Sequence, residues 1–177
     1  MGRYHYLRTK GEAESYLMTY GKRFANVTIF KPSVIFGKND NFILRFSNLL
    51  NFMPFIFPLA CHEAKFAPVY VEELSEFIVN SIKNTKSFNK KYDLSGPKDY
   101  TLKEILELII QTKKRKIKVI PLSKKLSKLQ AIIMEFIPGK PFSIDNFNSC
   151  QIDSICSSDY NFYSDLETII PTYINPQ

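Results

Sequence analysis

The chain has 177 residues, which suits one domain of ordinary size, and its 45% hydrophobic content is enough to form a core. The formal net charge is +7, but lysines are spread along the whole chain, so the charge indicates a solvated surface and not a nucleic-acid-binding face. Cys61, Cys150 and Cys156 are too few for a disulfide framework or a closed zinc site, and they predict reduced thiols in the cytoplasm.

The first predicted element is a helix over residues 7–23, where good helix formers dominate and Gly21 stands in the position of a C-cap. No apolar run precedes it, so we expect no secretory signal. A strand is predicted over 26–30, where β-branched and aromatic residues gather. Pro32 is expected to end this strand because proline cannot donate a hydrogen bond to a sheet.

The most apolar stretch covers residues 42–60, and it contains Arg45, amide side chains and two prolines. A membrane-spanning helix needs about 20 mostly apolar residues without such breaks, so we expect no transmembrane segment. We predict a buried helix over 42–50, capped by Asp40 or Asn41, and then a proline-rich apolar loop. A loose contact with a membrane surface stays open as an alternative.

Short strands and longer helices alternate in the remainder of the chain. Strands are predicted over 67–71, 91–94 and 116–120, and helices over 72–83, from 102 onward and over 123–136. Thr101 and Glu104 have the spacing of a capping box at the start of the middle helix. After a break at 138–141 the periodicity weakens, and residues 146–177 are expected to be an irregular tail. The alternation indicates an α/β protein.

Tyr6 and Lys10 are four residues apart, which places both on one face of a helix, one turn from each other. A lysine ammonium beside a tyrosine favours the phenolate. Such a pair suits a reaction in which tyrosine moves a hydroxyl proton while a nicotinamide moves the hydride. About one match of this kind is expected by chance among so many tyrosines and lysines, so an ordinary exposed helix start is the alternative.

Four blocks of the sequence, read in order from residue 6 to about 145, resemble the extended short-chain dehydrogenases of the NAD(P)-dependent epimerase/dehydratase family. The blocks are Tyr6-x-x-x-Lys10, the stretch 27–40 with Lys31-Pro32-Ser33-Val34, the stretch 65–74 with Pro68-Val69-Tyr70-Val71-Glu72, and the stretch 92–105 with Ser95-Gly96-Pro97 and Tyr100-Thr101. Within this family, residues 119–141 look like the branch of the nucleotide-binding accessory subunit of respiratory complex I.

The resemblance implies a fold and a set of roles. Residues 1–85 would form the C-terminal half of a Rossmann-type doubly wound sheet, and 86–145 a small mixed α/β substrate lobe. Tyr6 and Lys10 would be catalytic, Lys10, Pro32, Ser33 and Val34 would contact NAD or NADP, and Phe42, Arg45 and Tyr70 would face a small-molecule substrate. A strand-end turn for 32–34 and a packed aromatic for Tyr70 are the simpler alternatives. His5 and His62 are too few for a metal site.

The sequence departs from this family at the cofactor phosphates, which the family holds on a glycine-rich turn at a helix N-terminus. The glycines stand at 2, 11, 21, 37, 96 and 139, and no pair has the Gly-x-Gly or Gly-x-x-Gly spacing. We therefore expect a truncated oxidoreductase-like or sugar-nucleotide epimerase-like protein, a fragment that does not hold its cofactor alone. The alternative is a non-catalytic structural or assembly module related to the complex I subunit.

The expected partners follow from these two alternatives. They are a separate front-half polypeptide or an assembly of the complex I type, in the cytoplasm or peripherally at the inner membrane. The basic run 113–116 has no aromatic ladder beside it, so we read it as a charged turn and expect no nucleic acid. Uncovered sheet edges at 27–31 and 67–71 predict poor solubility or oligomers.

Overall fold

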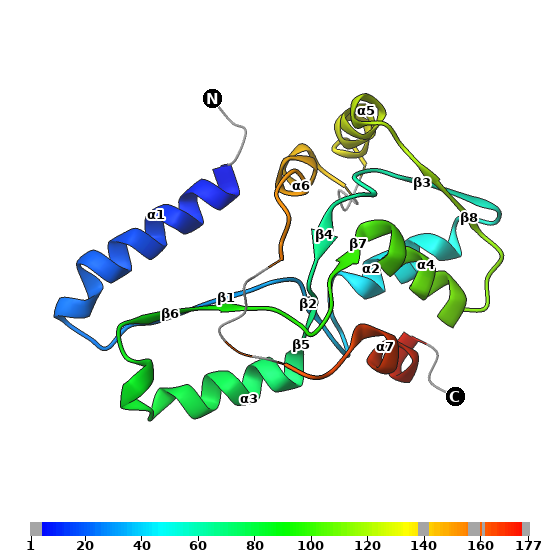
Figure 1. The fold of residues 1–177 in the computed structure, drawn as a ribbon. Coiled ribbons are helices and arrows are strands. Elements are labelled where there is room, and N and C mark those ends of the chain that lie inside the picture. Colours follow the sequence, from blue (N-terminus) through cyan, green and yellow to red (C-terminus); the bar gives the residue numbers. More distant parts are fainter. Residues whose placement is uncertain (1–4, 138–141, 156–159, 161, 175–177) are drawn as a thin grey trace.

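The computed structural model describes residues 5–137, 142–155, 160 and 162–174, and it is a mixed α/β structure, as expected (Figure 1). The helices are α1 (His5–Thr19), α2 (Ile43–Asn51), α3 (Val71–Ile82), α4 (Leu102–Thr112), α5 (Lys124–Met134), α6 (Ile144–Ser149) and α7 (Leu166–Ile174), with 3-10 turns η1 (Gly21–Arg23) and η2 (Thr85–Ser87). The strands are β1 (Thr28–Pro32), β2 (Ile35–Phe36), β3 (Ile56–Leu59), β4 (Lys65–Phe66), β5 (Val69–Tyr70), β6 (Lys90–Leu94), β7 (Tyr100–Thr101) and β8 (Lys118–Pro121).

Strands β1 and β6 form a parallel pair with a helix on each face. Phe30 of β1 and Tyr92 of β6 stack on one face, with ring centroids 5.9 Å apart, and both pack against Phe77 of α3. On the opposite face, Lys91 of β6 places its Nζ 2.7 Å from Glu14 Oε1 of α1. Helices α1 and α3 therefore lie on opposite sides of the pair, which is the local arrangement of a doubly wound sheet (Figure 1).

Strand β1 extends two residues beyond the predicted span and includes Pro32. Ser33 N donates to Leu94 O over 2.9 Å, so residues 29, 31 and 33 direct their backbone groups toward β6. The backbone groups of residues 28, 30 and 32 therefore point away from β6, and we call this side of the strand the outer edge of β1. Proline is tolerated in the strand because its missing N–H falls on this edge. Among the described residues, β6 is the only strand paired with β1.

The stretch after α2, expected to be a proline-rich loop, is a strand, and its proline is tolerated in the same way as Pro32. Residues 56–59 form β3, which pairs in parallel with β8. Lys118 N donates to Phe55 O and Leu122 N to Leu59 O, so the backbone groups of Pro58 point away from β8. The buried helix before this strand is confirmed as α2, which buries Ile43, Ser47 and Leu50.

The larger core cluster gathers α2, α4 and α7 around strands β3, β4 and β7, and its fully buried members include Leu50, Ile105, Ile109, Leu166 and Ile170. Helices α6 and α7 correct the expectation of an irregular tail over 146–177. Their helical pattern is weak in sequence because α6 has only six residues and α7 contains a proline. The division of the chain at residues 85 and 145 stays a prediction.

Helix ends differ from the predicted spans by a few residues. Helix α1 begins at His5 and ends at Thr19, before a 3-10 turn that carries Gly21. The capping box of Thr101 and Glu104 is confirmed at the start of α4. Ile82, the last residue of α3, is 65% exposed. Among the described helices, none has the length and apolar character needed to cross a bilayer.

Candidate functional site

Tyr6 and Lys10 lie one turn apart on α1, as the spacing predicts. The side chain of Lys10 is exposed, and the side chain of Tyr6 lies outside the part of the chain that the structure describes. In Figure 1, α1 runs beside β1 and β6, whereas α2 lies beyond the far end of β1. The residues predicted to be catalytic are therefore on a different element from the substrate-facing positions on α2.

Ser33 is held at the end of β1 by groups from three segments. It is 6% exposed, and its Oγ donates to Ser154 O over 2.6 Å while accepting from Ala67 N over 3.2 Å. Its neighbour Val34 accepts at its carbonyl oxygen from Val69 N over 2.8 Å. The predicted cofactor contacts Ser33 and Val34 thus form the junction between β1, β5 and the segment before α7. A cofactor role for Pro32, Ser33 and Val34 stays a prediction.

Gly96 shows why the Ser95-Gly96-Pro97 block stands beside the Ala67-Pro68 block. Gly96 N donates to Ala67 O over 3.0 Å. A Cβ atom added to Gly96 would lie 1.8 Å from Pro68 O, a distance at which the two backbones could not coexist. Two of the blocks that resemble the epimerase/dehydratase family are therefore in direct backbone contact, and they fix the chain where β6 ends.

Asp40 organises the loop between β2 and α2. The residue at the N-cap position of α2 is Phe42, and not Asp40 or Asn41 as expected. Asp40 Oδ1 nevertheless accepts from the backbone N–H groups of Phe42, Ile43 and Leu44 over 2.8, 2.5 and 3.2 Å and so satisfies the start of the helix. Asp40 Oδ2 accepts from the Tyr173 hydroxyl of α7 over 2.9 Å. Tyr173 was not identifiable from the sequence, since it lies 133 residues away in a tail of weak periodicity.

Two adjoining hollows surround this loop. The first, about 480 Å³, is lined by residues 34–42 and Val71, so it brings together the predicted positions Val34 and Phe42. The second, about 600 Å³, is lined by Arg45, which is exposed, and by polar residues of the same loop. Tyr70 packs its ring against Phe36, with centroids 5.6 Å apart. Substrate roles for Phe42, Arg45 and Tyr70 stay predictions.

The two phenols beside the loop are poor candidates for a base. Burial, followed by the Glu72 carboxylate, raises the pKa of Tyr70 above its usual value. Burial and then the Asp40 carboxylate raise the pKa of Tyr173. Both hydroxyls are therefore protonated at neutral pH and act as hydrogen-bond donors. The arrangement can orient and bind a polar ligand, but it does not supply an activated phenolate.

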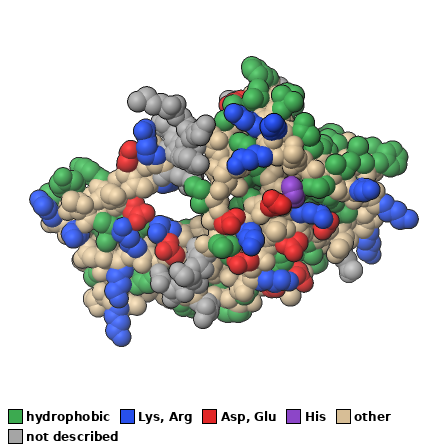
Figure 2. Space-filling model, turned by 45° about the horizontal axis from the view of Figure 1, so that its top comes forward, with side chains coloured by type: hydrophobic (Ala, Val, Ile, Leu, Met, Phe, Trp, Pro, Cys, Tyr) green, Lys and Arg blue, Asp and Glu red, His purple; other side chains and the backbone are tan. Residues whose placement is uncertain are grey.

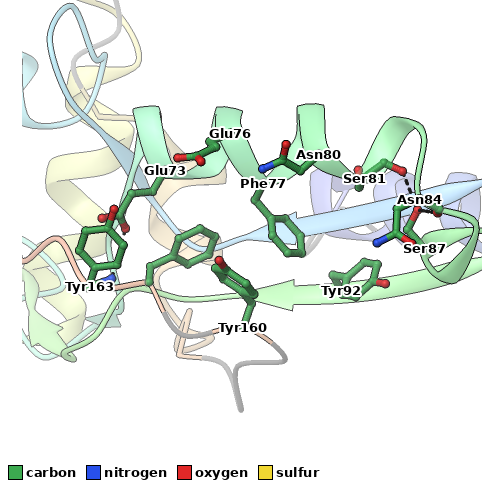
Figure 3. Close-up of a pocket in the computed structure, with 11 residues that line it drawn as sticks. Glu73, Glu76, Phe77, Asn80, Ser81, Asn84, Ser87, Tyr92, Tyr160 and Tyr163 are labelled. Carbon is green, nitrogen blue, oxygen red and sulfur yellow. Dashed lines mark hydrogen bonds between the residues drawn. The ribbon is translucent and has the colours of Figure 1, made fainter.

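A third hollow, about 350 Å³, lies between α3, Tyr92 of β6 and the side chains of Tyr160, Phe162 and Tyr163 (Figure 3). Phe77 faces Tyr160 there, with ring centroids 4.5 Å apart. Glu73 at the start of α3 reaches the segment before α7, where it accepts from Tyr163 N and Ser164 N over 3.2 and 3.1 Å. This carboxylate anchors the segment that leads into α7, and no residue predicted for the site lines the hollow.

The basic run 113–116 begins with a lysine that serves the fold. Lys113 donates from Nζ to Ser47 O and Oγ over 3.2 and 3.0 Å, which ties the end of α4 to α2. Burial, followed by the charge of Arg115, lowers the pKa of Lys113. Within the described residues, no group of three or more histidine, cysteine, aspartate or glutamate side chains is placed to hold a metal ion.

No protein-family model matches the chain. Its sequence is similar to curated proteins named NADH dehydrogenase (ubiquinone) 1 alpha subcomplex subunit 9, mitochondrial. The protein of Arabidopsis thaliana is 24% identical over 173 residues, which cover 92% of this chain and 42% of that protein. The protein of Rattus norvegicus is 26% identical over 161 residues, which cover 90% and 42%. The chain thus spans less than half the length of these relatives.

Solved structures share the fold. A nucleoside-diphosphate-sugar epimerase from Staphylococcus aureus superposes with a TM-score of 0.56 at 17% identity, covering 79% of this chain and 46% of that one. The dTDP-4-dehydrorhamnose reductase from Bacillus anthracis, solved with NADP, gives a TM-score of 0.53 at 19% identity, covering 77% and 44%. The sequence relatives and the fold agree with the family that the four sequence blocks indicate.

Proposed function

We propose that this relative of the subunit 9 proteins, which has the fold of NAD(P)-dependent epimerases and reductases, is a non-catalytic assembly module. In this proposal, the described residues form the C-terminal half of a nucleotide-binding unit. They join a glycine-rich half, on whichever polypeptide it is carried, and hold NAD or NADP only in that combination. The module would lie in the cytoplasm, peripherally at the inner membrane where its partners are bound.

The outer edge of β1 carries this proposal. The backbone groups of residues 28, 30 and 32 point to that side, and β6 occupies the other side. Parallel sheets in α/β proteins are normally covered by helices on both faces and continue over several strands, so a two-stranded pair between α1 and α3 is a small piece of such a sheet. A strand added at the outer edge would extend the sheet between the same two helix layers.

A second surface supports association with a partner. Helix α5 and the turn that follows it expose apolar side chains, which are Leu126, Leu129, Ile132, Ile133, Phe136 and Ile137. Phe52, Phe55 and Ile56, around the start of β3, are also exposed. Figure 2 shows hydrophobic side chains gathered along this side of the molecule. Large exposed apolar patches on soluble proteins mark contact surfaces, which is what an assembly module requires.

The test is association with a glycine-rich front half taken from one of the sequence relatives. Thr28→Pro removes an N–H group from the outer edge and leaves the ladder to β6 intact, since residue 28 faces away from β6. We expect this variant to weaken association, measured by calorimetry, by at least about tenfold. Thr28→Val is the matched control, because the Thr28 hydroxyl also donates to Ser87 O.

Two further variants distinguish a lost junction at the outer edge from a general loss of folding. Thr28→Val should associate like the unmodified chain, and Ile29→Pro should unfold β1 because residue 29 bonds to β6. If the front half does not bind the folded chain, or binds Thr28→Pro equally well, the outer edge is not the junction and the proposal is wrong.

A second candidate function rests on Tyr6 and Lys10 of α1. In the family that the sequence resembles, this pair performs oxidoreductase or epimerase chemistry. If the combined halves turn over a nucleotide-dependent substrate, Tyr6→Phe should lower the rate by about 10²–10⁴ while nucleotide binding is kept, because only a proton donor is lost. Unchanged turnover in that variant would show that Tyr6 is not the proton donor and is an ordinary residue of α1.

A further inference from the structure

A hollow of about 260 Å³ lies away from the proposed nucleotide side, between the end of β3, the first turns of α5 and the end of α6. Both cysteines that the structure describes, Cys61 and Cys150, line it. Its polar wall is made of Lys124, Ser127 and Gln151 together with His62, Glu63 and Asp153. No residue of the outer edge or of the Asp40 loop takes part, so this hollow is separate from the site described above.

The backbone around the two thiols is fixed from both sides. Cys61 lies two residues after the end of β3, adopts a positive φ of 52°, and donates its N–H to Ser127 Oγ of α5 over 3.3 Å. Cys150 is the C-cap of α6. The next residue, Gln151, directs its Nε2 to Cys61 Sγ at 3.9 Å, and both cysteines line the same hollow. The end of α6 is thereby held against Cys61.

The surroundings give the two thiols different roles. The hydrogen bond from Cys150 and the charge of Lys124 lower the pKa of Cys61 against the opposing effect of burial. The pKa of Cys150 is raised by the same hydrogen bond and by burial. In the proposal that follows, Cys61, beside Lys124, is the thiol that attacks the oxidant as its thiolate, and Cys150 is the thiol that resolves the product.

We propose that Cys61 and Cys150 form a redox-modification site that hydrogen peroxide converts to an intramolecular disulfide and that small thiols reverse. The Cys61 thiolate attacks one peroxide oxygen, the O–O bond breaks, and hydroxide leaves and takes up a proton to form water. The resulting sulfenic acid is attacked by Cys150, which loses its proton as the S–S bond forms, and the S–O bond breaks to release a second water. Two thiols and one peroxide give one disulfide and two waters.

The disulfide would join the turn after β3 to the end of α6, two segments 89 positions apart in the sequence. That turn also supports α4, because Leu102 N donates to Ala64 O and Lys103 N to His62 O. Oxidation would therefore restrict the movement of α6 relative to β3, β4 and the start of α4. Reduction by a small dithiol would break this disulfide and release α6, as is typical of accessible disulfides.

The experiment uses the full chain with Cys156→Ser, so that only the proposed pair is left. The protein is treated with hydrogen peroxide while it keeps its native circular dichroism spectrum, and intact mass and peptide mapping follow. We expect monomers that have lost two hydrogens, a cross-linked peptide pair that contains Cys61 and Cys150, and full reversal by dithiothreitol. Intermolecular dimers, or separate oxidation of each thiol to sulfinic acid, would overturn the proposal.

Two further variants assign the order of the steps. With Cys150→Ser added, dimedone should trap a sulfenic acid at Cys61, and with Cys61→Ser added, Cys150 should be left unmodified under the same treatment. Lys124→Gln should slow alkylation of Cys61 by iodoacetamide several-fold at neutral pH, whereas Lys125→Gln, on the neighbouring residue of α5, should not. Trapping at Cys150 in place of Cys61, or equal rates for the two lysine variants, would contradict the assigned roles.

Discussion

Asp40 connects the β2–α2 loop to α7 through one carboxylate. Asp40→Ala removes the acceptor for the first N–H groups of α2 and for the Tyr173 hydroxyl. Loss of a helix cap costs about 0.5–2 kcal/mol, and the unpaired Tyr173 hydroxyl adds to it. We expect urea unfolding to show a loss of about 2 kcal/mol for Asp40→Ala. Tyr173→Phe, the control, should lose about 1 kcal/mol because the cap is kept.

If the two variants destabilise equally, Asp40 contributes through Tyr173 alone, and its capping role would be contradicted.

Gly96 tests the contact between the two family-like blocks. Gly96→Ala places a methyl group against Pro68 O, and the backbone must shift to accept it. Overpacking of this kind costs about 1–3 kcal/mol, so the melting temperature should fall by several degrees. Gly11→Ala is the matched control, because a Cβ atom there meets no atom within 4 Å and alanine favours the helix by about 0.5–1 kcal/mol. An unchanged melting temperature for Gly96→Ala would contradict the close approach of the two backbones.

At this scale, the sequence can identify local chemistry but not distant partners. Asp40 and Thr101 are recognisable as acceptors for the first N–H groups of a helix, because the groups they bind follow within four residues. Ser154 and Tyr173 are not recognisable, since they meet Ser33 and Asp40 from more than 100 residues away. Such contacts depend on the path of the whole chain, which a spacing rule does not contain.

Helix α4 offers a pH-dependent test at the level of one element. The Thr101 backbone N–H, and then its hydroxyl, lower the pKa of Glu104. A carboxyl group with a lowered folded-state pKa stabilises the protein above its unfolded pKa of about 4.3, and this contribution is lost as pH falls through the folded-state value. Glu104→Gln keeps the capping geometry and removes the charge. We expect it to cost a few tenths of a kcal/mol to about 1 kcal/mol at pH 7 and nothing near pH 2.

Urea unfolding of both proteins at the two pH values measures this difference. A cost that is the same at pH 7 and pH 2 would show that the Glu104 charge does not support α4.

Strands were harder to predict than helices because two of the strands contain a proline. Helices α2, α3, α4 and α5 have apolar residues at helical spacing, and their positions were predicted to within a few residues. Strands β1 and β3 contain Pro32 and Pro58, which a local rule reads as strand ends. Both prolines are tolerated because their backbone nitrogens face away from the pairing strand, and only the pairing register determines that.

At the scale of the whole molecule, the four family-like blocks predicted the fold and its α/β layers. They did not predict how the candidate site residues lie relative to one another. Lys10 stands on α1, whereas Arg45 belongs to α2 and Phe42 directly precedes it, and the path of the chain between these helices determines how the two regions meet. In the proposal above, pairing at the outer edge of β1 belongs to the combined halves, so the residues of this chain alone would not specify it.

The central claim is that these residues bind a nicotinamide nucleotide only in combination with a glycine-rich half. Calorimetric titration of NADH and NADPH into the chain alone, and into the chain with that half, tests it directly. We predict binding to the chain alone no tighter than about 1 mM, or about −4 kcal/mol, and binding at least about tenfold tighter in the combination. A micromolar dissociation constant for the chain alone would contradict the account.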